Sequence, residues 1–185
     1  EEIQVKLQES LGLKNKLAVP ALKKIIISMG LGEAKENKDV LDKVKVLLLN
    51  KEEAALLAGE NLSAAETVEG KKKVFKKLDQ LVRGIAVMTD GPKGVWVSDG
   101  KRIYQADIFP NKELMDRTGA GDAFGSGFVA GLLASEDVAE AIRLASANAT
   151  SVVEAIGAHT SALTLKDYQR HSRWKHLEIK IHDLV

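Results

Sequence analysis

The chain has 185 residues, enough for one domain with a buried core, and its 27 Lys and Arg nearly balance 26 Asp and Glu, for a net charge of +1. This balance gives no strong electrostatic field toward nucleic acid or a membrane surface, so a small metabolite or a protein surface is the more natural partner. The absence of Cys excludes disulfides and a thiolate nucleophile and suits a cytoplasmic protein, and we expect neither a membrane-spanning segment nor a secretory leader.

Short helices and apolar strands follow one another in the first half of the chain. Apolar runs predict the strands, and helical periodicity with capping residues predicts the helices. The expected strands cover residues 25–27, 46–49 and 85–89. The expected helices cover residues 2–11, 40–44, 50–57, ended by Gly59, and 63–81, where Ser63-Ala-Ala-Glu66 has the spacing of a capping box.

The second half begins with a predicted hairpin. The dipeptide Asp99-Gly100, a typical hairpin turn, joins short strands over residues 94–97 and 102–104. The remaining expected elements are a helix after the Gly-rich stretch at Thr118 through Leu133, a helix from Asp137 to Gly157, a small helix over 165–171 and an edge strand over 177–181. Strands separated by helices predict a three-layer α/β/α fold with a mainly parallel sheet.

The segment with the clearest chemical meaning is Asp116-Arg-Thr-Gly-Ala-Gly-Asp122. Gly119, Ala120 and Gly121 stand where a helix begins, so their unpaired N–H groups and the helix dipole can hold an anion. Asp122 follows directly and can take a proton from a hydroxyl held beside that anion. Hydroxyl phosphorylation requires this combination of donors and base.

An ordinary structural explanation also stays open for this segment. Gly-rich turns often precede helices, and Asp in a first helical turn is stabilising without any chemistry. Other phosphate motifs fit less well, because the chain has no Gly-Lys-Ser/Thr P-loop and the glycines at 119, 121 and 125 miss the dinucleotide spacing by one residue.

Four motifs, in order, resemble those of ribokinase-like (PfkB-type) carbohydrate kinases. The segment 116–122 is similar to the family's Asp-Thr-x-Gly-Ala-Gly-Asp pattern, with Arg117 at a tolerant position. Thr89-Asp-Gly-Pro-Lys-Gly94 resembles its Thr-x-Gly-x-x-Gly turn along the nucleotide phosphates, and Asn50-Lys-Glu-Glu53 resembles its magnesium element. Asn148 and Gly157-Ala158 match the adenine region. Taken singly, the second and third motifs could be a hairpin turn and a capping box.

The resemblance implies a role for each matched position. Asp122 would be the general base, beside an anion hole formed by the amides of residues 119–121. The implied contacts to ATP are Thr89, Gly91, Gly94, Asn148, Gly157 and Ala158. Glu53 and Asn50 would organise Mg²⁺ through water. Some members also hold a monovalent cation such as K⁺, and the positions at or near that site are Asp116, Thr118, Gly157 and Ser161.

Residues 1–44 resemble a different protein, large-subunit ribosomal protein five, which binds 5S ribosomal RNA. The similar stretches are Leu17-Ala-Val-Pro20, Lys24-Ile-Ile-Ile-Ser-Met-Gly-Leu-Gly-Glu-Ala34 and Asn37-Lys-Asp-Val-Leu41. We therefore expect a chimera, with a helix–strand segment over 1–44 packed on the sheet of a ribokinase-like nucleotide-binding half-domain over 45–185. The family's sugar-binding half and its lid are not found in the chain.

Three functions remain open from the sequence. The first is ATP-dependent phosphoryl transfer to a sugar-like alcohol, impaired because the sugar-binding half is missing. The second is a folded chimera that binds ATP or ADP without turnover. The third is ribosomal RNA binding through residues 1–44, against which the near-neutral charge argues. An uncovered sheet edge also favours a homodimer.

Overall fold

The computed structural model describes residues 44–184. The helix expected over 2–11, the strand expected over 25–27 and almost all of the helix expected over 40–44 lie outside the described residues, as does the hypothesis that the segment 1–44 packs on the sheet.

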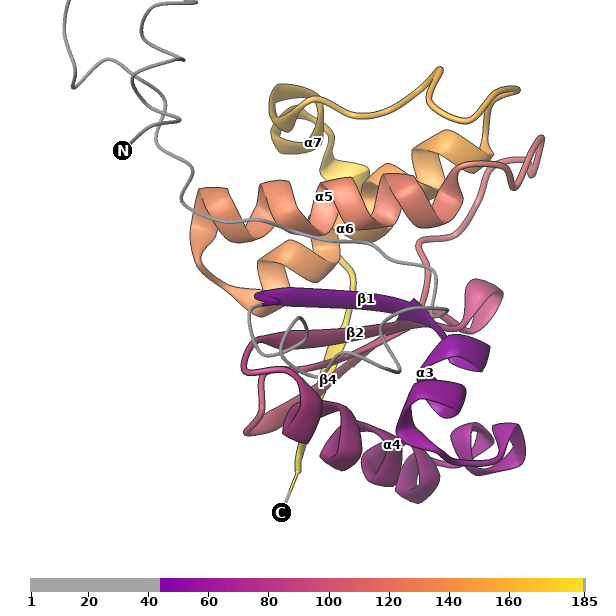
Figure 1. The fold of residues 1–185 in the computed structure, drawn as a ribbon. Helices are drawn as coiled ribbons and strands as arrows, with labels where there is room; N and C mark the ends of the chain where they lie inside the picture. The colour runs from indigo at the N-terminus through magenta and orange to yellow at the C-terminus, as the bar shows by residue number, and fades with distance from the viewer. Residues whose placement is uncertain (1–43, 185) are drawn as a thin grey trace, which may run out of the picture.

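The described residues form a five-stranded sheet between two layers of helices (Figure 1). The strands, adjacent in the order of their numbers, are β1 Val46–Asn50, β2 Ile85–Thr89, β3 Val95–Ser98, β4 Arg102–Ala106 and β5 Ile179–Asp183. The helices are α3 Lys51–Ala58, α4 Val68–Leu81, α5 Ala120–Ser135, α6 Val138–Val153 and α7 Leu165–Arg170, with 3-10 turns at Leu62–Glu66, Gly91–Lys93 and Ser172–Lys175.

Two apolar cores lie on opposite faces of the sheet, because successive strand residues point to opposite sides. Leu47 and Leu49 of β1 belong to the core under α3 and α4, which includes Phe75. Val46 belongs to the other core, with Phe128 of α5. Figure 1 shows α3 and α4 on one face of the sheet and α5 and α6 on the other. The predicted α/β/α layering is confirmed.

The described part of the sheet is mixed, where a mainly parallel one was expected. Only β1 and β2 pair in parallel, through the crossover that α4 provides. The pairs β2–β3, β3–β4 and β4–β5 are antiparallel. The pairs β2–β3 and β3–β4 are antiparallel because each is joined by a short connection, the turn after β2 and the turn at Asp99-Gly100. A parallel neighbour would need a crossover connection of a dozen or more residues.

The helix ends that capping residues predicted are confirmed for α3 and for the start of α6. The Asn50 side chain accepts a hydrogen bond from the Glu53 N–H at 2.8 Å, and the Glu53 carboxylate accepts one from the Asn50 N–H at 2.9 Å, which completes the capping box of α3. Gly59 ends that helix with φ of 66°. The carboxylate of Asp137 caps α6, which ends at Val153 rather than near Gly157.

The helix expected to begin at Ser63 was misplaced. Residues Leu62–Glu66 form a 3-10 turn, and α4 begins at Val68 with Thr67 as its cap, the hydroxyl accepting from the Gly70 N–H at 3.1 Å. The Glu66 carboxylate does not close the expected box, because it binds Lys51 and Lys93. The last strand is also displaced, to Ile179–Asp183.

Within residues 44–184, none of the helices combines the length and apolar character needed to cross a bilayer.

Candidate functional site

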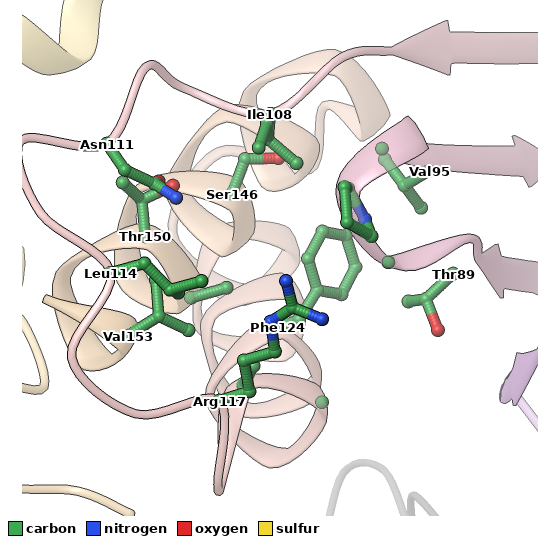
Figure 2. Close-up of a pocket in the computed structure, with 16 residues that line it drawn as sticks. Thr89, Val95, Ile108, Asn111, Leu114, Arg117, Phe124, Ser146, Thr150 and Val153 are labelled. Atoms are coloured by element: carbon green, nitrogen blue, oxygen red, sulfur yellow. The ribbon is translucent and has the colours of Figure 1, made fainter.

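A cavity of about 400 Å³ lies between the end of the sheet and the helices α5 and α6 (Figure 2). The turn after β2, the connection from β4 to α5, the first turn of α5 and the second half of α6 form its wall. The lining residues are Thr89, Gly91, Pro92, Gly94, Val95, Ile108, Asn111, Leu114, Arg117, Ala120, Gly121, Phe124, Ser146, Ala149, Thr150 and Val153. Most of these side chains are apolar, which suits a flat organic ligand.

The cavity brings together residues from two motifs that the sequence singled out separately. Thr89, Gly91 and Gly94 line one part of the wall, and Ala120 and Gly121 line another. Gly94 has φ of 86°, and a Cβ there would lie 2.0 Å from the Ala106 carbonyl oxygen. Only glycine fits this position, so the turn can lie directly against the end of β4.

Two of the three predicted anion-hole amides are free in the described part of the chain. No described residue accepts a hydrogen bond from the N–H of Gly119 or Gly121, whereas the Ala120 N–H donates to the Arg117 carbonyl at 3.3 Å. The first expectation of three converging donors is therefore reduced to two. Helix α5 begins here, with Gly119 as its cap at φ of 80°, and its dipole favours an anion.

The Asp122 carboxylate is exposed in the first turn of α5. No group among residues 44–184 forms a hydrogen bond or an ion pair with it. It follows directly after Gly121, which lines the cavity. Asp122 itself does not line the cavity, and its carboxylate is free to accept a proton.

Two loops are held together behind the start of α5. Asp116 accepts hydrogen bonds from the Thr118 N–H at 2.9 Å and from the Gly157 N–H at 3.4 Å. Hydrogen bonds from Thr118, and then the one from Gly157, lower the pKa of Asp116 below its ordinary value. A Cβ on Gly119 would lie 2.3 Å from the Ala158 carbonyl oxygen, so this close approach also requires glycine. Gly157 and Ala158 therefore support the Gly119 turn, and neither lines the cavity.

Asn148 was expected near the adenine, but its side chain is buried and bonded at both ends. Its amide nitrogen donates to the Ala123 carbonyl at 2.8 Å, and its amide oxygen accepts from the Leu163 N–H at 2.7 Å. The geometry assigns Asn148 to positioning the first turn of α5. The α6 residues that do line the cavity are Ser146, Ala149, Thr150 and Val153. Their spacing of three and four residues places them on one helical face, and this spacing is visible in the sequence.

The residues expected to act on Mg²⁺ lie at the same end of the sheet. The register of β1 and β2 pairs Asn50 with Thr89. Within residues 44–184, no group of three or more His, Asp and Glu side chains could hold a metal ion. Neither Asn50 nor Glu53 lines the cavity, and their side chains close the capping box of α3. Mg²⁺ commonly uses one or two carboxylates with water and substrate phosphates, and Glu53 supplies one carboxylate of that kind.

The residues expected near a monovalent cation are used within the protein. Besides the bonds to Asp116, the Ser161 hydroxyl donates to the Ser151 carbonyl, and the Ser151 hydroxyl donates to the Ser161 carbonyl at 2.7 Å. These bonds join the end of α6 to the loop that follows it. They leave oxygen lone pairs free but do not by themselves define a cation site.

An ion-pair network that sequence reasoning missed supports the turn after β2. Lys51 lies 2.6 Å from Glu66 and 3.0 Å from Asp90, and Lys71 lies 3.4 Å from Asp90. The Asp90 side chain is only 7% exposed. The bond to Glu66, followed by that to Asp90, raises the pKa of Lys51. Asp90 stands between Thr89 and Gly91, so the network ties α3 and α4 to this turn.

Comparison with known proteins agrees with this geometry. The family described as "pfkB family carbohydrate kinase" matches residues 15–165. The fold resembles that of Arabidopsis thaliana ribokinase, solved with ribose and ATP, at a TM-score of 0.71 and 24% identity over 93% of this chain and 52% of that one. The chain therefore belongs to the pfkB carbohydrate kinase family.

Curated relatives come from two families, as the sequence predicts. A cytidine kinase of Thermococcus kodakarensis is 31% identical over 121 residues, 65% of this chain and 41% of the relative. Large ribosomal subunit protein uL5 of Natranaerobius thermophilus is 34% identical over 104 residues, 56% of this chain and 49% of the relative. The chain thus spans less than half the length of each of these relatives.

Proposed function

We propose that the cavity binds ATP or ADP and that the chain carries the chemistry of ATP-dependent phosphoryl transfer to a sugar-like alcohol. The observation that supports this most directly is that the 89–94 turn and the residues Ala120 and Gly121 line one cavity. The chain belongs to a kinase family, which supports a common role for the two turns in holding nucleotide phosphates. The unpaired Asp122 carboxylate, next to Gly121 in the chain, supplies the general base.

Each residue then has a defined task. The base of the nucleotide occupies the apolar part of the cavity, and its phosphates extend toward Gly119 and Gly121. The N–H groups of these glycines stabilise the charge on the transferring phosphoryl group. Asp122 removes the proton from the attacking hydroxyl. Mg²⁺ neutralises phosphate charge when it is bound, near Glu53 and Asn50.

Three finer points belong to the same proposal. The proposed acceptor class is supported by relatives that are named for a nucleoside or a sugar, cytidine kinase and ribokinase. A K⁺ ion near Asp116, Thr118 and Ser161 would stabilise the loop behind the anion hole. We further propose a cytoplasmic chimera, in which a ribosomal-protein-like segment over 1–44 precedes the kinase half-domain over 45–185.

A nucleotide-binding module without turnover is the second candidate. This candidate is supported by the cavity alone, which offers a nucleotide an apolar wall whether or not an acceptor alcohol is held in line for transfer. Binding of 5S ribosomal RNA is a third candidate, supported by the similarity to uL5 but opposed by the net charge of +1.

Calorimetry and a coupled ADP-release assay test these candidates in the full chain. We expect ADP with Mg²⁺ to bind, and we expect ATP turnover with ribose or cytidine as acceptor. Asp122→Asn should abolish turnover, because the general base is lost. It should leave ADP affinity nearly unchanged, because the Asp122 carboxylate does not hold the nucleotide. Nucleotide binding without turnover selects the binding module. No nucleotide binding by the wild-type protein refutes the proposal.

A further inference from the structure

One charged side chain lines the cavity, that of Arg117. Figure 2 shows it extending from its loop into the space between the other labelled residues. Within residues 44–184 its guanidinium group forms no ion pair and no hydrogen bond. The sequence had placed Arg117 at a tolerant position and given it no role.

The backbone places this cation beside the start of α5. The Arg117 carbonyl accepts the hydrogen bond from the Ala120 N–H, which makes a tight turn just before the helix. Gly121, in the first turn of that helix, lines the same cavity. The guanidinium charge and the positive end of the helix dipole therefore act on one region.

An acidic side chain of the protein is the ordinary partner for such an arginine. Asp116, its neighbour in the chain, already accepts hydrogen bonds from Thr118 and Gly157. No acidic residue lines the cavity. The rest of the wall carries no charge and is mostly apolar, with Val95, Ile108 and Phe124 among its residues. A ligand that matches the whole cavity has a flat apolar part and an anionic part.

We propose that Arg117 binds the α- or β-phosphate of the nucleotide and makes the cavity prefer nucleotides over nucleosides. This inference rests on the proposed function, because it requires the nucleobase to pack against the apolar wall of the cavity. A guanidinium group donates paired N–H bonds to phosphate oxygens, a geometry that the Lys ammonium cannot reproduce. The contact is made in bound ADP as well as in ATP, so it acts on affinity rather than on the transfer step.

Calorimetry of the full chain with ADP and with adenosine, both with Mg²⁺, tests this role. We expect Arg117→Gln to weaken ADP binding by about 10- to 100-fold, the range for a charge-assisted hydrogen bond. Adenosine binding should stay within about twofold, because adenosine carries no phosphate. Arg117→Lys should give an intermediate ADP affinity. Arg170→Gln, a matched change at an exposed residue of α7 outside the cavity, should leave both affinities unchanged.

The outcomes separate the two proposals. Equal losses for ADP and adenosine, or no loss for either, would overturn the role of Arg117 while nucleotide binding by the wild-type protein stands. Failure of the wild-type protein to bind ADP refutes the nucleotide site itself, and with it the role of Arg117. Urea midpoints of all variants show whether any loss of affinity reflects unfolding.

Discussion

Replacement of Asn148 by Ala tests whether this residue positions α5 or contacts a ligand. Its amide nitrogen donates to the Ala123 carbonyl, which also accepts from the Ser126 hydroxyl at 3.1 Å. Loss of this donor therefore costs only the net value of one hydrogen bond, about 0.5–1.5 kcal/mol. The Leu163 N–H would lose the acceptor that the structure gives it, at a cost of about 1–3 kcal/mol. We expect the free energy of unfolding to fall by about 1.5–4.5 kcal/mol.

Urea denaturation with linear extrapolation measures this loss. Asn111→Ala is the matched control, because Asn111 is exposed at the cavity and has no hydrogen bond within residues 44–184. It should change stability by no more than about 0.5 kcal/mol. The positioning role is wrong if Asn148→Ala leaves stability within that range and yet weakens ADP binding tenfold or more, since that result would indicate a direct contact.

Two further perturbations address the turn after β2 and the ion pairs that support it. Gly94→Ala should destabilise the fold by clearly more than Gly100→Ala. Both glycines have positive φ, which costs an alanine about 1–3 kcal/mol. A Cβ on Gly94 would in addition overlap the Ala106 carbonyl, whereas one on Gly100 meets open space. Equal losses in urea denaturation would contradict this. Hydrogen bonds from Lys51 and then Lys93 lower the pKa of Glu66 from 4.5 to about 2. Its carboxylate should therefore stabilise the fold above pH 4.5, and this contribution should fade as the pH falls toward 2. The stability difference between wild type and Glu66→Gln should shrink over that interval, and a constant difference would show that the carboxylate charge is not responsible.

Local chemistry explains the elements that the sequence predicted well. The capping box of Asn50 and Glu53, the turn at Asp99-Gly100 and the cap at Asp137 each satisfy backbone groups within a few residues. Such bonds need no distant partner, so their spacing along the chain is enough to locate them. The Gly-rich turn before α5 was recognised for the same reason.

The misplaced start of the helix predicted at Ser63 has a different cause, because it depended on distant partners. Glu66 has the spacing of a helix cap, but it binds Lys51 and Lys93 from other elements. The hydrogen bonds of Asn148 also join distant partners, Ala123 and Leu163, and its contact with adenine stays a prediction. The mixed sheet has a local cause instead, because the connection after β2 is too short to return the chain in parallel.

The sequence by itself determined the layered fold class and the helix boundaries set by local caps. It also located the two glycine-containing turns predicted to bind phosphate, at 89–94 and 119–121, with Asp122 next to the second. These features follow from backbone hydrogen bonds and apolar periodicity over short distances. Only the tertiary structure decided that the turns meet at one cavity, that one face of α6 completes its wall and that Arg117 supplies its charge. The physical reason is that packing the helices on the sheet sets which side chains from remote elements face the same space.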